Sequence, residues 1–109
     1  MSTDTLLVIT NLPDRASAET LAWTLVDRRA AACVNILAPC RSVYRWKGAV
    51  ETAEEHPIFA KTTRERYSLL ERVVRELHPY ELPEIIAVPI GGGLPAYLEW
   101  VSAETRPGN

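Results

Sequence analysis

Residues 33–62, CVNILAPCRSVYRWKGAVETAEEHPIFAKT, contain two long runs of strand-favouring residues separated by Lys47-Gly48, a pair typical of a hairpin turn. Pro39 interrupts the first run and predicts a bulge or kink at that point. Pro57 cannot donate to a β-ladder, so it predicts an edge position or a bulge in the second run. The sequence therefore predicts an unusually long β-hairpin in the middle of the chain.

The segment before the hairpin predicts a strand and a helix. Leu6–Ile9 is a continuous apolar run that ends at a turn cluster, which indicates a buried central strand. Residues 17–32 place apolar side chains at three- and four-residue spacing, as an amphipathic helix does. Ser17 is the N-cap that we expect for this helix.

The segment after the hairpin completes the pattern. Residues 64–77 predict a second amphipathic helix, with Thr63 as its cap. Glu84–Ile90 predicts a fourth strand, and Pro95 suits the first turn of a terminal helix. We therefore expect an α+β fold in a single domain, residues 1–109. It is a ferredoxin-like βαββαβ sandwich with an extra C-terminal helix and a long hairpin.

The composition narrows the classes of function. Hydrophobic residues make up 47% of the chain and charged residues 24%, which is ordinary globular usage and disfavours disorder. A net charge of −2 disfavours a nucleic-acid-binding surface. Met1–Asp4 lacks the start of a secretory signal, and no apolar run approaches the ~18 residues of a membrane span. We expect a cytoplasmic protein with neither nucleic acid nor membrane as a partner.

The reach of the hairpin predicts self-association. A domain of this size has a radius of gyration of about 13 Å, whereas a strand of about fourteen residues spans more than ~40 Å. The hairpin should therefore project past its own core and carry Tyr44 and Trp46 with it. Because aromatic side chains on projecting elements are typical interface anchors, we expect Tyr44 and Trp46 at an oligomer interface. The alternative is a hairpin that curls over its own sheet.

Two cysteines, Cys33 and Cys40, lie seven positions apart in the first run of the hairpin. An odd separation along one strand places them on opposite faces, so a mutual disulfide would need a bend, which Pro39 could supply. In a reducing cytosol we expect free thiols. Their spacing matches no zinc-finger pattern, and we interpret them as small buried hydrophobes.

Two further segments carry ionisable side chains. Residues 51–56 form an acidic stretch ending in His56, which we interpret as a solvated strand face with at most a loose attraction for cations. Residues 78–84, HPYELPE, combine an imidazole, a phenol and two carboxylates in a loop stiffened by two prolines. Imidazole is the commonest metal ligand, and a histidine with a nearby glutamate suits copper or zinc.

We therefore expect His78 and Glu81 as metal ligands, completed by groups from a second subunit. The alternative is a loop between helix and strand whose polar groups bond to neighbouring backbone. No nucleophile with an activating base is visible, so we predict no catalytic residue and no enzyme. An enzyme using His78 with Glu81 or Glu84 in acid–base roles is the remaining alternative.

Five blocks of sequence, in order along nearly the whole chain, resemble the CutA divalent-cation tolerance family. They are 31–36 (AACVNI), 43–48 (VYRWKG), 61–63 (KTT), 78–86 (HPYELPEII) and 96–100 (AYLEW). The resemblance implies a ferredoxin-like fold in a tight homotrimer, similar to the PII signal proteins that bind small ligands in clefts between subunits. It also implies a response to metal ions, with copper bound by some members and no agreed enzymatic activity.

The family's metal-binding pattern includes a cysteine late in the first strand and a histidine pair before Pro-Tyr. Thr10 and Leu77 occupy those positions here, and His78 is the one histidine left. We expect a trimeric, PII-like protein without a required cofactor, which binds copper, another divalent cation or a small ligand between subunits. The alternative is a trimeric signalling or interaction module with no direct metal binding.

Overall fold

The order of strands and helices matches the expected one, with one strand divided in two. A computed structural model describes residues 4–108. Met1–Thr3, part of the segment in which we expect no secretory signal, and Asn109 lie outside these residues. The elements are β1 (Thr5–Leu12), α1 (Arg15–Asp27), β2 (Cys33–Ile36), β3 (Cys40–Trp46), β4 (Ala49–Thr63), α2 (Tyr67–Leu77), β5 (Ile86–Pro89) and α3 (Pro95–Glu104).

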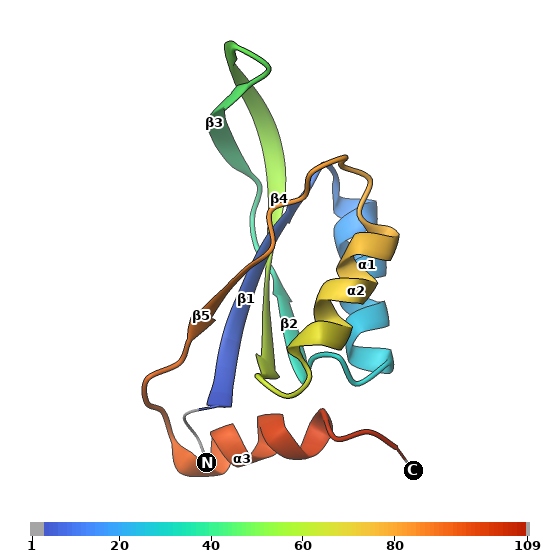
Figure 1. Ribbon diagram of the computed structural model, residues 1–109, viewed down its shortest axis with the longest axis vertical. Helices are drawn as coiled ribbons and strands as arrows, with labels where there is room; N and C mark the ends of the chain where they lie inside the picture. The colour runs from blue at the N-terminus through green and yellow to red at the C-terminus, as the bar shows by residue number, and fades with distance from the viewer. Residues whose placement is uncertain (1–3, 109) are drawn as a thin grey trace.

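The sheet has the strand order β2-β4-β1-β5, and β3 pairs with the far half of β4. All pairings are antiparallel, and the prediction of a central first strand is confirmed because β1 lies between β4 and β5. Helices α1 and α2 lie side by side on one face of the sheet, and α3 crosses one end of it (Figure 1). No helix among residues 4–108 is long and apolar enough to span a membrane.

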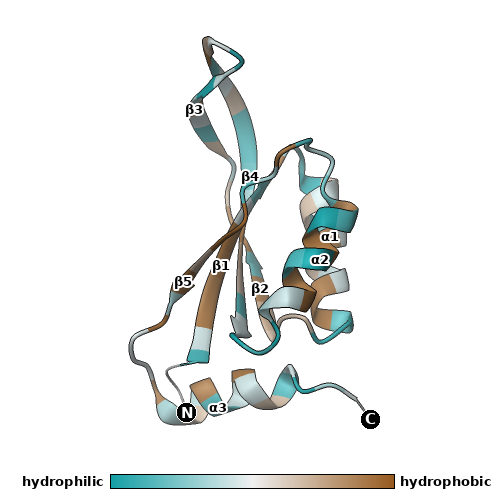
Figure 2. Ribbon diagram, viewed as in Figure 1, coloured by the Kyte–Doolittle hydropathy of each residue, from teal (hydrophilic) through white to brown (hydrophobic). Residues whose placement is uncertain are grey.

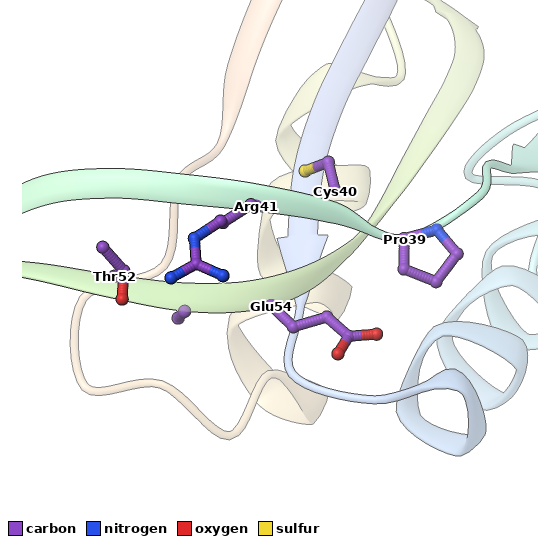
Figure 3. Close-up of a pocket in the computed structure, with 6 residues that line it drawn as sticks. Pro39, Cys40, Arg41, Thr52 and Glu54 are labelled. Carbon is purple, nitrogen blue, oxygen red and sulfur yellow. The ribbon is translucent and has the colours of Figure 1, made fainter.

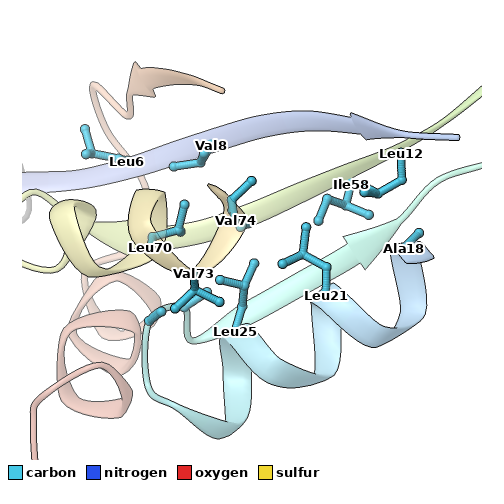
Figure 4. Close-up of a cluster of buried hydrophobic side chains, with 13 residues drawn as sticks. Leu6, Val8, Leu12, Ala18, Leu21, Leu25, Ile58, Leu70, Val73 and Val74 are labelled. Atoms are coloured by element: carbon cyan, nitrogen blue, oxygen red, sulfur yellow. The ribbon is translucent and has the colours of Figure 1, made fainter. Parts of the chain in front are cut away.

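The core fills the space between the sheet and the two helices, as Figure 4 shows. Alternate residues of β1 and β4 meet side chains spaced three or four apart on α1 and α2. Burial of each large aliphatic side chain stabilises the fold by about 1.5–3 kcal/mol. The largest side chains that are completely buried are Leu12, Leu21, Leu25, Ile58 and Leu70.

Both helices begin at residues other than those predicted. The N-cap of α1 is Asp14, since its carboxylate accepts the backbone N–H of Ser17 at 2.8 Å; the prediction of Ser17 as the cap is wrong. The predicted end at residue 32 is also wrong: the helix ends at Asp27, because Arg29 takes a left-handed φ of 59°. Helix α2 begins three residues later than predicted, because Thr63 accepts the N–H of Arg66 in a separate turn.

The hairpin of β3 and β4 extends well beyond the helices and the other strands (Figure 1). Its turn is of type I′, with φ values of 50° at Lys47 and 84° at Gly48, and Trp46 lies opposite Ala49. The molecule measures 44 × 28 × 23 Å and has a radius of gyration of 14.5 Å. This exceeds the value of about 13 Å for a compact domain of the same length, so the projection predicted from sequence is confirmed.

The predicted bulge lies between β2 and β3. Strand β2 ends with Ile36 opposite Ile58, and β3 begins with Cys40 opposite Glu55, so residues 37–39 face only residues 56–57. The extra residue is the bulge expected at Pro39. Pro57 lies opposite it within β4, and its carbonyl accepts the N–H of Leu37 at 3.0 Å.

The bulge changes the orientation predicted for the cysteines. Cys33 lies opposite Lys61 and Cys40 opposite Glu55, and these two partners share one face of β4 because their separation is even. Both cysteines therefore lie on the same face, and the prediction of opposite faces is wrong. Both are free, as expected, but Cys40 is exposed and Cys33 half-buried, so the prediction of full burial is also wrong.

Candidate functional site

Residues 78–84 join α2 to β5 and pack against the end of β1 and the base of the hairpin; we call this segment the junction loop. His78 ends α2, and its ring is buried. Its Nε2 lies 2.7 Å from the carbonyl oxygen of Asn11, and its Nδ1 accepts the backbone N–H of Tyr80 at 3.2 Å. Because a carbonyl only accepts, Nε2 carries the proton and the ring is neutral.

This environment alters the titration of His78. Burial lowers its pKa below the usual 6.5, and the hydrogen bond to Asn11 and the charge of Glu55 oppose that shift without cancelling it. Both ring nitrogens are occupied by backbone groups. A metal ion at His78 would therefore have to displace one of the two hydrogen bonds.

Tyr80 connects the junction loop to the hairpin. Its ring centre lies 4.9 Å from that of His78, and its hydroxyl donates to Oε2 of Glu55 at 2.8 Å. Burial raises the pKa of Tyr80 to about 12, with further contributions from the hydrogen bond and the charge of Glu55. The phenol therefore remains a donor over the whole physiological range.

The other end of the loop is held at β1, where the side-chain amide of Asn11 donates to Oε1 of Glu84 at 3.1 Å. Strand β5 begins at Ile86, two residues later than the predicted start at Glu84. Between the two ends, Glu81 and Leu82 are exposed. Residues 4–108 contain no group of three histidine, cysteine, aspartate or glutamate side chains arranged to hold a metal ion.

Two residues of this site, Asn11 and Glu55, were not predicted from the sequence. Glu55 belongs to the stretch interpreted as a solvated face, but it is only 9% exposed, so that interpretation is wrong for this residue. A glutamate is unusual in a strand, and this was the available signal. Asn11 follows an apolar run and resembles an ordinary turn residue, so no local pattern marks it.

The hairpin and β5 expose apolar side chains that the chain itself does not cover. Tyr44 is 40% exposed, whereas Trp46 is half-buried and has the Lys47 ammonium 5.6 Å from its ring centre. Ile86 and Val88 of the edge strand are 48% and 44% exposed. Figure 2 shows the hydrophobic colour running along β1 and β5. Exposed apolar groups on an unpaired edge strand are typical of an interaction surface.

An open hollow of about 410 Å³ lies at the base of the hairpin (Figure 3). It is on the strands and not in the junction loop. Arg41 and Glu54, which face each other in the β3–β4 register, bring charges of opposite sign to its wall. The residues that line it are Pro39, Cys40, Arg41, Thr52, Ala53 and Glu54.

With this geometry in place, similarity to known proteins decides the family. The model of the CutA1 divalent ion tolerance protein family matches residues 6–104. The chain belongs to this family. It is 41% identical over 99 residues to the divalent-cation tolerance protein CutA of Thermus thermophilus, an alignment covering 91% of this chain and 96% of that one.

Two further members agree. The chain is 40% identical over 104 residues to the chloroplastic protein CutA of Arabidopsis thaliana, covering 93% of this chain and 56% of that longer protein. Its fold matches the crystal structure of CutA from Xylella fastidiosa with a TM-score of 0.92 and 41% identity, over 94% and 99% of the two chains. The ferredoxin-like fold expected from the resemblance is therefore confirmed.

Proposed function

We propose that this member of the divalent-cation tolerance family is a homotrimeric, PII-like protein that binds a divalent metal ion or small ligand and catalyses no reaction. The observation that carries the proposal is the projecting hairpin, whose Tyr44, like Ile86 and Val88 of β5, is only partly covered. Copies of the chain would cover these side chains and pair the free edge of β5. We propose a cytoplasmic location as well.

The junction loop is the proposed ligand site. Its bond to Glu55 holds it at the base of the hairpin, so subunits that associate through their hairpins bring the loop next to a neighbour. His78 and the exposed Glu81 are the proposed metal contacts, with copper as the first candidate and further ligands from the adjacent subunit. Both ring nitrogens of His78 contact backbone groups, so neither is free to accept a proton, which argues against acid–base catalysis. A metal ion would have to take the place of one of these two hydrogen bonds.

A second candidate function, a trimeric interaction module without direct metal binding, is favoured by the same two hydrogen bonds. These two bonds give His78 a structural role that needs no metal ion. Leu82, which is 70% exposed on the same loop, would then contact a protein partner.

Calorimetric titration of the tag-free protein with Cu²⁺ and Zn²⁺ separates the two candidates. The metal proposal predicts binding that His78→Ala abolishes and that His56→Ala, the matched control on β4, leaves intact. Binding that survives His78→Ala contradicts the site. A wild-type protein that binds neither ion favours the interaction module.

A further inference from the structure

We propose that the Tyr80–Glu55 hydrogen bond couples the junction loop to the hairpin, so that a change in the order of either segment is transmitted to the other. Glu55 is thus a positioning residue for the loop. The significance of this coupling rests on the proposed function, because the loop is the proposed ligand site and the hairpin the proposed contact between subunits.

Glu55 occupies the point where the hairpin leaves the body of the protein. The pairing of β1 with β4 ends at Leu12 opposite His56, the residue next to Glu55. Glu55 itself pairs with Cys40, the first residue of β3 beyond the bulge. From there to the turn, β4 has only β3 as a neighbour in the sheet. Glu55 therefore lies where the hairpin leaves the rest of the sheet.

The junction loop has one hydrogen bond to the hairpin. Its other side-chain contacts, from His78 and Glu84, lead to Asn11 of β1 or remain within the loop. Among the hydrogen bonds that the junction loop makes to other parts of residues 4–108, only that from Tyr80 ends on the hairpin. This bond is the direct connection between the loop and the hairpin.

Loss of this hydrogen bond would destabilise the fold. Glu55 is 9% exposed, and the phenol of Tyr80 is its hydrogen-bond donor. A shielded carboxylate without a donor is driven toward water, which would move the base of the hairpin. A hydrogen bond to a charged group is strong enough to change a local opening equilibrium by roughly tenfold or more.

Amide hydrogen exchange of the metal-free protein, read by mass spectrometry, tests the coupling. Tyr80→Phe removes only the hydroxyl, and we expect exchange to become roughly tenfold faster both in the junction loop and at residues 50–56. Glu55→Gln keeps an acceptor for the phenol and should retain much slower exchange than Tyr80→Phe in both segments. Tyr67→Phe, on α2, is the control and should change neither. Faster exchange in the loop alone, with the hairpin unchanged, would overturn the proposal.

A second experiment uses Cu²⁺ as the probe and separates this proposal from the proposed function. If wild-type protein gives no heat of binding, the metal proposal fails, while the metal-free exchange still decides the coupling. Where Cu²⁺ binds, it should slow exchange at residues 50–56 in the wild type and not in Tyr80→Phe. Equal protection of the hairpin in both proteins would overturn the coupling.

Discussion

His78 is held as a neutral imidazole between the carbonyl of Asn11 and the N–H of Tyr80. Burial lowers its pKa below 6.5, so between these two values the unfolded chain binds more protons than the folded one. The free energy of unfolding should therefore decrease as the pH falls from 6.5 to the native pKa. Histidine proton shifts, followed by NMR in chelator-treated buffer, should show this depressed pKa directly.

The other histidine provides the comparison for that titration. His56→Gln leaves His78 as the one histidine, so its resonances and the slope of stability against pH can be assigned without ambiguity. A native His78 that titrates at or above 6.5 would contradict the buried, backbone-bonded ring.

Gly48 adopts a φ of +84° at the tip of the hairpin, where a Cβ would meet no neighbour but would suffer backbone strain. Gly48→Ala should lower the free energy of unfolding by about 1 kcal/mol. Gly91→Ala is the matched control, since Gly91 also has open space around its Cβ position but does not need a positive φ. Denaturant titration at one fixed protein concentration measures both, and equal effects would contradict the assigned turn.

At the scale of the elements, the start of α1 depends on Asp14. Asp14→Ala removes the acceptor for the Ser17 amide and should destabilise the protein by about 1 kcal/mol. Ser17→Ala removes only a hydroxyl that donates to the same carboxylate and should cost less than half as much. Chemical denaturation compares the two variants, and a larger loss for Ser17→Ala would restore Ser17 as the capping residue.

Local sequence patterns predicted the order of the elements better than their boundaries. Apolar periodicity and strand-favouring residues predicted the order of the elements, except that the first strand of the hairpin is divided into β2 and β3. The predicted starts of α1 and α2 were wrong, whereas that of α3 at Pro95 was right. For α1, Asp14 and Ser17 are both good caps, and only the tertiary structure selects between them. The faces of Cys33 and Cys40 were wrong because one extra residue at the bulge reverses the alternation.

The candidate site was predicted only in part, because some of its residues are adjacent in sequence and others are not. The junction loop stood out because its prolines, imidazole and carboxylates are adjacent in sequence. Its partners Asn11 and Glu55 come from strands 67 and 25 residues away from their contacts in the loop. Such pairings depend on the register of β1 and β4, which no local pattern specifies.

For the whole molecule, the central feature is the hairpin of β3 and β4, which projects beyond the rest of the domain. Trp46 lies at its tip, where a charge would oppose packing against another subunit. Trp46→Asp should weaken self-association at least tenfold without unfolding the body, which circular dichroism would check. Trp23→Asp is the control, because Trp23 is 78% exposed on α1 and takes no part in the proposed contact.

Sedimentation equilibrium of the wild-type protein at micromolar concentration tests the self-association most directly. The projecting hairpin and the free edge of β5 predict self-association, and the proposed trimer predicts a mass close to three times 12.2 kDa. A folded species of 12.2 kDa at that concentration would contradict the trimer, and with it the cleft between subunits in which the junction loop is proposed to act.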